Sequence, residues 1–407
     1  MTPRATPSAP ALPRSKATRR PATASAKRRE PSAFRVGIDR PLVVSIIGTR
    51  PEAIKMTPVA RALAASSRFG QRVVLTGQHA ELNCEWATDD LRVDPSYLSA
   101  GELSGAIRDR LRPLLARLRP SLVLVQGDTA SALAGALAAC DCAIPIGHVE
   151  AGLRSFDLQH PWPEEGNRIA IDELSTLLFA PTEQSAHNLT AEPSVDGAIF
   201  ITGNSGIDAL FQARGARPAP PIASDRKLIL VTCHRRENRG AELDRLAAAL
   251  RRIVDRLPLQ IVLPLHTNPH VRAGIEQRLS GCAHIHLEEP AGHAEMVGLI
   301  DASWLILTDS GGLQEEGPAL GKPVLVLRSV TERAEAPDNI ELVGTDPDRI
   351  FEAVERLWTD AERYRRMATP SLAFGDGHAG ERIAAIVKHF LSDPKGPFPN
   401  AWRQKRG

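Results

Sequence analysis

The sequence predicts an α/β protein with two doubly wound domains, and three observations carry that prediction. Short segments rich in Val, Ile and Leu alternate with helical segments from residue 41 onward. The alternation runs through the chain twice, and a Pro- and Ala-rich linker at 213–224 separates the two cycles. Polar motifs directly follow several of the strands. Such alternation indicates parallel sheets, so we expect the two domains to face one another and ligands to bind at the carboxyl ends of the strands.

The first cycle begins with the strand PLVVSIIG at 41–48, an apolar run without a polar face. The segment 51–66 has apolar residues at helical spacing, and Pro51 suits the first turn of that helix. Further strands are expected at 72–76, 121–127, 142–149 and 198–203. Uniformly apolar strands are typical of a parallel sheet that helices cover on both faces.

The second cycle repeats the pattern after the linker. Its expected strands are 227–232, 259–265, 283–288, 303–309 and 322–327. Its expected helices include 242–256, 312–320 and 347–358. No short-period repeat interrupts either cycle, so the two domains account for most of the chain.

The first 40 residues differ from the rest of the chain. They hold ten lysines and arginines and two acidic residues, although the whole chain has a net charge of only +2. Pro, Ala, Ser and Arg dominate, and too little apolar surface is present to offset the entropy of ordering, so this tail is predicted to be disordered. It also lacks the apolar core of a secretory signal. Weak binding to nucleic acid or to an acidic surface is one interpretation, and a dispensable tail is the other.

The overall composition excludes several classes of protein. No apolar run approaches the ~18 residues that cross a bilayer, so no membrane partner is expected. Five scattered cysteines without a CxxC pair argue against a zinc ribbon or a disulfide framework, and they fit a reducing, cytoplasmic setting. The histidines at 266, 270, 284 and 286 lack accompanying cysteine or acidic ligands, so no metal site is expected.

The segment SWLILTDSGGLQEEGPAL at 303–320 carries the most informative phosphate signal. A strand ends at Asp309, and Ser310, Gly311 and Gly312 then turn into a helix. Glycines allow close approach of an anion, and free N–H groups at a helix start favour negative charge. Glu316, about one turn into the helix, could accept hydrogen bonds from a ribose diol. The alternative is an ordinary strand-to-helix turn whose carboxylates stabilise the helix dipole.

Two further strand ends carry cations. Arg50 and Lys55 in GTRPEAIK flank the start of the first helix, where two positive charges oppose the helix dipole unless an anion binds there. His234 in VTCHRREN could donate to a phosphate or a leaving group. Solvated surface cations, or pairing with nearby acids, are the alternatives for both segments.

Acidic residues follow strands of the first cycle. Asp128 lies in QGDTAS, Glu150 in GHVEAGLRS, and Glu164 and Glu165 in HPWPEEGNR at the entry to a helix. Each alone could be a helix cap or an ion-pair partner. Together, opposite a phosphate site, they have the arrangement expected for acid–base chemistry on a nucleotide-linked sugar.

The chain resembles the non-hydrolysing bacterial UDP-N-acetylglucosamine 2-epimerase family. The resemblance lies in GTRPEAIKMTP, GDT, GHVEAGLRS, PWPEEGNR, ITGNSGIDAL, VTCHRREN, LTDSGGLQEEGPALGKPVLVLR and TERAEA, in order, over about residues 41–390. It implies the GT-B fold, two Rossmann-like domains with an active-site cleft between them, and a last helix that returns to the first domain. It also implies interconversion of UDP-GlcNAc and UDP-ManNAc without a cofactor, and a homodimer.

The resemblance also implies site residues and boundaries. It assigns Asp128, Glu150, Glu164 and His234 to catalysis, and UDP contacts to Arg50, Lys55, His234, Ser310, Gly311, Gly312, Glu316 and Arg333. The expected parts are the tail at 1–40, the first domain at 41–207, the UDP-binding domain at 208–374, the returning helix at 375–393 and a C-terminal tail at 394–407.

Two other functions stay open at this point. A hydrolysing epimerase would release free ManNAc and UDP, but its relatives tend to carry an Arg-Glu pair after the GD, where this chain has Thr129 and Ala130. A GT-B glycosyltransferase, or an inactive sugar-nucleotide binder, is the other class. The retained acids argue against an inactive protein, and nothing in the sequence marks an acceptor groove.

Overall fold

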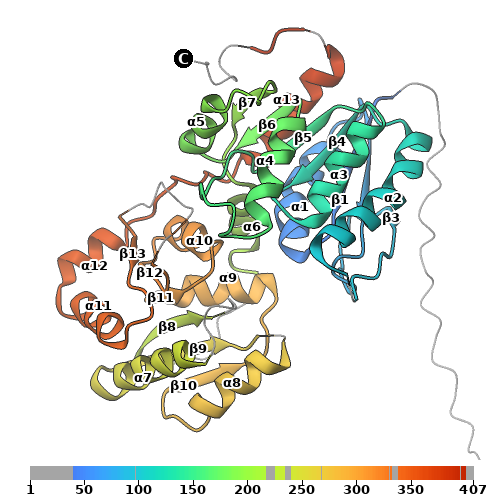
Figure 1. The fold of residues 1–407 in the computed structure, drawn as a ribbon. Helices are drawn as coiled ribbons and strands as arrows, with labels where there is room; N and C mark the ends of the chain where they lie inside the picture. Colours follow the sequence, from blue (N-terminus) through green and yellow to red (C-terminus); the bar gives the residue numbers. More distant parts are fainter. Residues whose placement is uncertain are drawn as a thin grey trace, which may run out of the picture. The chain divides into compact units, whose positions relative to one another are not determined.

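A seven-stranded parallel sheet forms the first half of the protein, in the order β3-β2-β1-β4-β5-β6-β7 (Figure 1). The computed structural model describes residues 40–96, 98–216, 225–233, 240–266, 268–329, 331, 338–394 and 396–399. The strands are β1 Leu42–Ile47, β2 Gly70–Leu75, β3 Asp89–Asp90, β4 Leu122–Gln126, β5 Ile146–Val149, β6 Leu177–Ala180 and β7 Ala198–Ile201. The helices are α1 Arg50–Ala64, α2 Ala100–Leu118, α3 Ala130–Asp141, α4 Glu164–Leu174, α5 Glu183–Ala191 and α6 Ser205–Ala213.

A six-stranded parallel sheet follows, in the order β10-β9-β8-β11-β12-β13. Its strands are β8 Lys227–Thr232, β9 Leu259–Pro264, β10 Ile285–Glu288, β11 Leu305–Thr308, β12 Val324–Val326 and β13 Ile340–Leu342. Its helices are α7 Ala241–Arg256, α8 Pro269–Leu279, α9 His293–Ala302, α10 Leu313–Ala319, α11 Pro347–Thr359 and α12 Ala361–Met367, and α13 Ala379–Ser392 ends the series. Both sheets therefore have the doubly wound arrangement expected from the sequence.

The order of the strands locates a preferred ligand position in each sheet. In the first sheet the chain moves outward from β1 to β3 and then resumes on the other side of β1 at β4. The second sheet makes the same reversal between β8 and β11. Ligands of open α/β sheets bind at such reversal points, beyond the carboxyl ends of the strands. Ligand-binding residues are therefore expected in the segments that follow β1, β4, β8 and β11.

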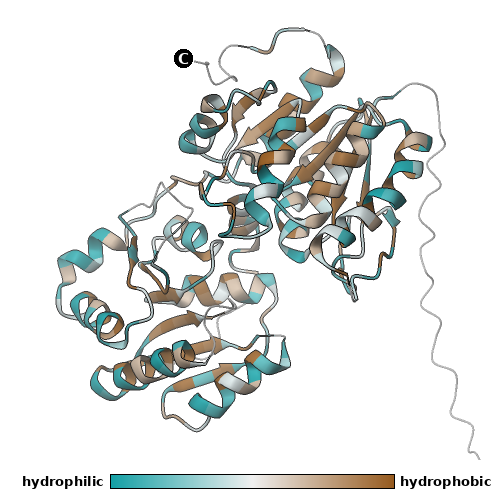
Figure 2. Cartoon of the chain, viewed as in Figure 1, coloured by the Kyte–Doolittle hydropathy of each residue, from teal (hydrophilic) through white to brown (hydrophobic). Residues whose placement is uncertain are grey.

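The central strands of both sheets are buried on both faces, which explains their apolar sequences. Neighbouring residues of β1 point to opposite sides: Val43 and Ile47 belong to one apolar core, whereas Val44 and Ile46 belong to another. Figure 2 shows hydrophobic strands beneath helices whose outer faces are hydrophilic. Because alternate side chains enter two different cores, the register of each strand is strongly specified.

The last helix packs on the first sheet. Ile383, Ile386, Val387 and Phe390 of α13 join the core that contains Val59 of α1. The carboxylate of Asp208 in α6 accepts hydrogen bonds from the first backbone N–H groups of α13, at 3.1 and 2.8 Å. Burial raises the pKa of Asp208. Helix α13 is therefore held by its apolar face and by a capping carboxylate.

Several sequence expectations differ from the structure in detail. The strand expected at 142–149 begins only at Ile146, because the segment 142–145 forms the turn after α3 and includes Pro145. The four-residue β6, the three-residue β13 and the two-residue β3 were not expected. The proposed boundary after residue 207 falls inside α6, so the division into domains stays a prediction. Of the predicted tails at 1–40 and 394–407, residues 1–39, 395 and 400–407 lie outside the described residues.

Candidate active site

The loop after β4 lies at the reversal point of the first sheet and presents Asp128. The guanidinium of Arg168 in α4 binds its carboxylate through Nη2 and through Nε, the latter at 3.1 Å. Asn167 donates to the backbone oxygen of Asp128 at 2.8 Å. Two residues of one helix thus hold the loop of the predicted catalytic acid. Arg168 stands in the PWPEEGNR motif, but sequence reasoning did not assign it this role.

The same arginine reaches a second acid, Glu165. Its Nη1 donates to Glu165 at 3.2 Å, and this carboxylate also accepts backbone N–H groups of Ser155 and Phe156 at 3.0 Å. Glu165 is only 1% exposed. Glu165 therefore anchors the loop between β5 and α4, whereas its neighbour Glu164 has a different environment.

Glu164 is the first residue of α4 and is half-buried. Its carboxylate makes no hydrogen bond or ion pair with another residue in the described part of the chain. The preceding Pro163 provides no side-chain cap. A carboxylate at this position is stabilised by the N-terminal end of the helix, and it stays available to a ligand.

Glu150 follows β5 and is the most completely enclosed of the predicted catalytic acids, at 8% exposure. Lys55 Nζ lies 2.7 Å from both of its carboxylate oxygens. Gln126 at the end of β4 and Asn204 at the start of α6 also donate to it, the latter at 3.3 Å. The backbone of Glu150 has φ +71°, a conformation that is strained for a residue with a side chain. The surrounding contacts hold the carboxylate in place despite that strain.

Glycine at position 127 brings these groups together. Its φ of +67° turns the chain out of β4, and a Cβ atom added there would lie 3.7 Å from Glu150 Oε2. The carboxylate of Glu150 therefore lies beside the residue that precedes Asp128. His148 supports the same loop. Its Nε2 contacts the backbone oxygen of Gly127 at 2.8 Å, and its Nδ1 contacts the buried Asp172 at 2.6 Å.

Glu52 is a buried acid that sequence reasoning missed. It accepts hydrogen bonds from the backbone N–H groups of Gly48 and Thr49 and from the hydroxyl of Thr129. Burial raises its pKa to about 7, against the lowering effect of those donors. Because Thr49 caps α1 and Thr129 caps α3, Glu52 ties together the two helices that begin at the reversal point. The motif GTRPE contains this capping-box glutamate, so the capping pattern was the available signal.

The two cations predicted in this region differ in their contacts. Lys55 is engaged by Glu150, as described above. Arg50 is exposed, and its guanidinium makes no hydrogen bond or ion pair within the described residues. A Cβ atom added at Gly292 would lie 3.8 Å from Arg50 Nη2, so this side chain reaches the start of α9.

At the reversal point of the second sheet, the chain leaves β11 through Asp309, Ser310, Gly311 and Gly312. Asp309 is fully buried, and the backbone N–H of Ser310 donates to Thr308 Oγ1 at 2.9 Å. Thr308 Oγ1 also lies 2.5 Å from the hydroxyl of Thr232 on β8. Neighbouring hydroxyls and backbone therefore order the turn, and α10 begins directly after Gly312.

Two adjacent acids follow in α10. Asn204 donates to Glu315, which is 5% exposed. Burial raises the pKa of Glu316 to about 7, and the neighbouring charge of Glu315 adds to this effect, whereas Lys55 opposes it. Lys55 is thus close enough to act on acids that follow strands of both sheets.

Two predicted site residues, His234 and Arg333, lie outside the described residues. Among the described residues, no group of three or more His, Cys, Asp and Glu side chains is arranged to hold a metal ion. No described helix has the length and apolar character needed to cross a membrane.

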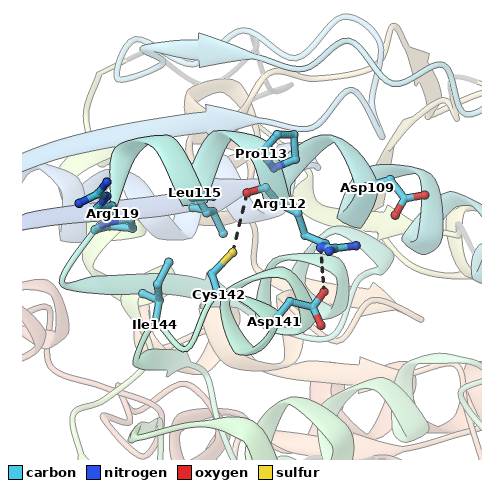
Figure 3. Close-up of a pocket in the computed structure, with 10 residues that line it drawn as sticks. Asp109, Arg112, Pro113, Leu115, Arg119, Asp141, Cys142 and Ile144 are labelled. Carbon is cyan, nitrogen blue, oxygen red and sulfur yellow. Dashed lines mark hydrogen bonds and ion pairs between the residues drawn. The ribbon is translucent and has the colours of Figure 1, made fainter.

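A separate surface hollow lies at the ends of α2 and α3 and is shown in Figure 3. Its lining includes Arg112, Asp141 and Cys142, and Arg112 Nε lies 3.5 Å from Asp141. Pro120 and Ile144 in its wall lie two residues before β4 and β5, so the hollow lies near the amino ends of these strands. This is the edge of the sheet opposite to the acids, and the hollow is not part of the candidate site.

The two reversal points, one carrying acids and one carrying a glycine turn, define a GT-B-like α/β protein. Residues 61–388 match the family model described as UDP-N-acetylglucosamine 2-epimerase. The chain belongs to the UDP-N-acetylglucosamine 2-epimerase family, whose members are isomerases.

The relatives align with most of the chain. The UDP-N-acetylglucosamine 2-epimerase of Escherichia coli K12 is 43% identical over 370 residues, which are 85% of this chain and 98% of that protein. The UDP complex of S. aureus MnaA is 37% identical, with a TM-score of 0.79, over 88% of this chain and 99% of that one. The Neisseria meningitidis UDP-GlcNAc 2-epimerase bound to UDP-GlcNAc is 38% identical, with a TM-score of 0.78, over 86% and 100%.

Proposed function

We propose that this chain is a non-hydrolysing epimerase that interconverts UDP-GlcNAc and UDP-ManNAc, or a close derivative of them. One observation carries the proposal. The Glu150 carboxylate, bound by Lys55, lies beside Gly127, and the adjacent Asp128 is bound by the helix that Glu164 begins. Asp128 and Glu150, which differ in exposure and in partners, thus lie together near the reversal point of one sheet, and Glu164 begins the helix that binds Asp128.

The proposed reaction begins with cleavage of the C1–O bond, because the proton on C2 is only weakly acidic. The electron pair of that bond leaves with the β-phosphate oxygen of UDP, and the sugar gains oxocarbenium character. A carboxylate then takes the proton from C2, and the C1=C2 bond of 2-acetamidoglucal forms. In the reverse direction, an acid protonates C2 on the opposite face and the UDP oxygen attacks C1, which completes the inversion at C2.

The three acids divide this work between them in the proposal. Glu150 and Glu164 share the two proton transfers at C2, and Asp128 acts with them on the sugar. His234 assists the departure of UDP. Because Glu150 and the departing diphosphate would both contact Lys55, this cation can stabilise charge on either of them.

The second sheet and the start of α1 hold UDP in this proposal. Ser310, Gly311 and Gly312 provide backbone close to a phosphate, and Glu316 accepts hydrogen bonds from the ribose. The guanidinium of Arg50 is free to bind the diphosphate. The family resemblance adds Lys55, His234 and Arg333 to the proposed UDP contacts. The UDP and UDP-GlcNAc complexes of the S. aureus and N. meningitidis relatives support a UDP-sugar ligand.

The non-hydrolysing type is favoured by the residues that follow Asp128. Thr129 caps α3 and donates to Glu52, so this position supports the structure of the loop. An Arg-Glu pair, as in hydrolysing relatives, is absent there. We also expect a homodimer, with twice the 44.0 kDa mass of one chain in light scattering.

NMR of the purified enzyme with UDP-GlcNAc in deuterated water tests the proposal. The expected result is a mixture of UDP-GlcNAc and UDP-ManNAc with deuterium at C2 and without accumulation of free ManNAc. Free ManNAc together with UDP would establish the hydrolysing type instead. An unchanged spectrum that still shows UDP binding would leave only a nucleotide-sugar binder or a transferase.

A further inference from the structure

Asn204 lies between β7 and α6, and its side chain joins the acids of the two sheets. It is 3% exposed. Its Nδ2 donates to Glu150 Oε1 at 3.3 Å and also to Glu315 Oε2. These partners lie 54 and 111 residues away in the chain. A single amide therefore contacts a proposed catalytic carboxylate and the residue next to Glu316.

The orientation of this amide is determined by its other contacts. Its carbonyl oxygen accepts the backbone N–H of Gly206 at 2.9 Å, which makes Asn204 the N-cap of α6. Its own backbone N–H donates to Phe374 at 2.8 Å. A flipped amide would place its oxygen against two carboxylates and its NH2 group against an N–H donor. Only the observed orientation satisfies all the groups around it.

The neutral charge of Asn204 matters because carboxylates surround it. Asn204 binds Glu150 and Glu315, and Glu315 already helps to raise the pKa of its neighbour Glu316, so a further negative charge would favour protonation of these acids. An amide supplies two N–H groups without adding charge. It can therefore hold Glu150 in place and leave the balance of protons among the acids unchanged.

We propose that Asn204 is a positioning residue that fixes the Glu150 carboxylate for proton transfer and couples its position to the nucleotide-binding segment through Glu315. The inference rests on the proposed epimerase function. Asn204 does not touch the reacting atoms; it acts through Glu150. Binding of UDP next to Glu316 is thereby linked to the geometry of the acid that acts on C2.

Two substitutions separate this role from helix capping. Asn204→Asp keeps the size of the side chain and an oxygen that caps α6, but it removes both N–H donors and adds a negative charge. Asn204→Ser keeps a capping hydroxyl, but this side chain is too short to bridge the two carboxylates. Asn268→Asp is the matched control, because Asn268 caps α8 in the same way, through His270 N at 2.9 Å, and its side chain has no carboxylate partner in the described part of the chain.

The measurements are kcat and KM for UDP-GlcNAc between pH 6 and 9, together with Tm. Both Asn204 variants should lose at least tenfold in kcat, and Asn204→Ser should keep KM within about threefold. In Asn204→Asp the acidic limb of the kcat profile should move to higher pH, because the added carboxylate favours protonation of the base. The control should keep the wild-type profile.

A purely structural role predicts a different result. Both Asn204 variants would then lower Tm, while kcat and the position of the acidic limb stayed as in the wild type; this outcome overturns the inference. Failure of the proposed function is seen separately, since the wild-type enzyme would then fail to exchange the C2 proton before any variant is compared.

Discussion

The two sheets have the same order of strands, but the side chains at their carboxyl ends are very different. In the first sheet, Asp128, Glu150 and Glu165 are bound by the cations Lys55 and Arg168. In the second sheet, the turn after β11 contains the buried Asp309, a serine and two glycines, and Glu315 and Glu316 follow in α10. Each sheet thus offers a ligand position at its reversal point. Asp128 and Glu150 are held by side-chain partners, whereas a phosphate can be bound by backbone N–H groups alone.

The largest expected effect comes from the acids of the first sheet. Asp128→Asn, Glu150→Gln and Glu164→Gln should each lower kcat by 10²–10⁴-fold, the range for loss of a general acid or base. UDP should still bind with nearly normal affinity in calorimetry, because the nucleotide is assigned to the other sheet. Deuterium exchange at C2, followed by NMR, checks this directly.

Glu183→Gln is the matched control for Glu164→Gln. Glu183 is also the first residue of a helix, α5, and is exposed. This variant should keep full activity. If all three amide variants exchange C2 at near-wild-type rates, the acids are structural and the contrast between the two sheets has no catalytic meaning.

Removing Glu316 tests the other side of the comparison. Glu316→Ala should weaken UDP binding by roughly 1.5–3 kcal/mol, the contribution of hydrogen bonds to a charged group. Since burial raises the pKa of Glu316 to about 7, the carboxylate becomes protonated as the pH falls below 7 and accepts hydrogen bonds from the ribose less well. UDP affinity of the wild type should therefore fall from pH 8 to pH 6.

Glu316→Gln provides the comparison for this pH dependence, because UDP itself also titrates in this range. Calorimetry of both proteins across the same pH series removes the contribution of the ligand. The wild type should lose more affinity than the variant as the pH falls. Equal losses would mean that Glu316 does not contact the nucleotide in its ionised form.

The pH dependence of the unfolding free energy tests the role of Glu52 at the reversal point of the first sheet. Its folded-state pKa of about 7 lies above the ordinary 4.5, so the protonated form is favoured by folding. The resulting stabilisation is present below about pH 4.5 and is lost as the pH rises through about 7. Relative to Glu52→Gln, the wild type should lose roughly 2–3 kcal/mol of unfolding free energy between pH 5 and pH 8. Denaturant unfolding at both pH values measures this difference, and a constant difference would show that Glu52 stays ionised throughout.

The sequence predicts the regular parts of this molecule well for a physical reason. Strands such as β1 and β8 are buried on both faces, so their apolar runs are unmistakable. Acids and glycines directly after strands then lie at the correct edge of a parallel sheet without further information. The short strands β6 and β13 were not identified, although β7 and β12, which have the same lengths, were.

The partners within the site could not be predicted in the same way. The contacts of Arg168 with Asp128 and of Asn204 with Glu315 join residues 40 and 111 positions apart. Such pairs depend on how helices pack, and a single sequence holds no record of that packing. The same limit applies to Glu52, because its capping role was visible in the sequence but its contact with Thr129 was not.

The smallest expected effect concerns the basic N-terminal tail. No predicted site residue belongs to it, since the first of them is Arg50 and β1 begins at Leu42. Deleting residues 1–38 should therefore leave kcat/KM within about threefold, well below the ~1.4 kcal/mol that corresponds to a tenfold change. Steady-state kinetics of the shortened protein, with Tm as the control for folding, decides the matter. A hundredfold loss of kcat/KM in folded protein would show that the tail contributes to one of the two sites.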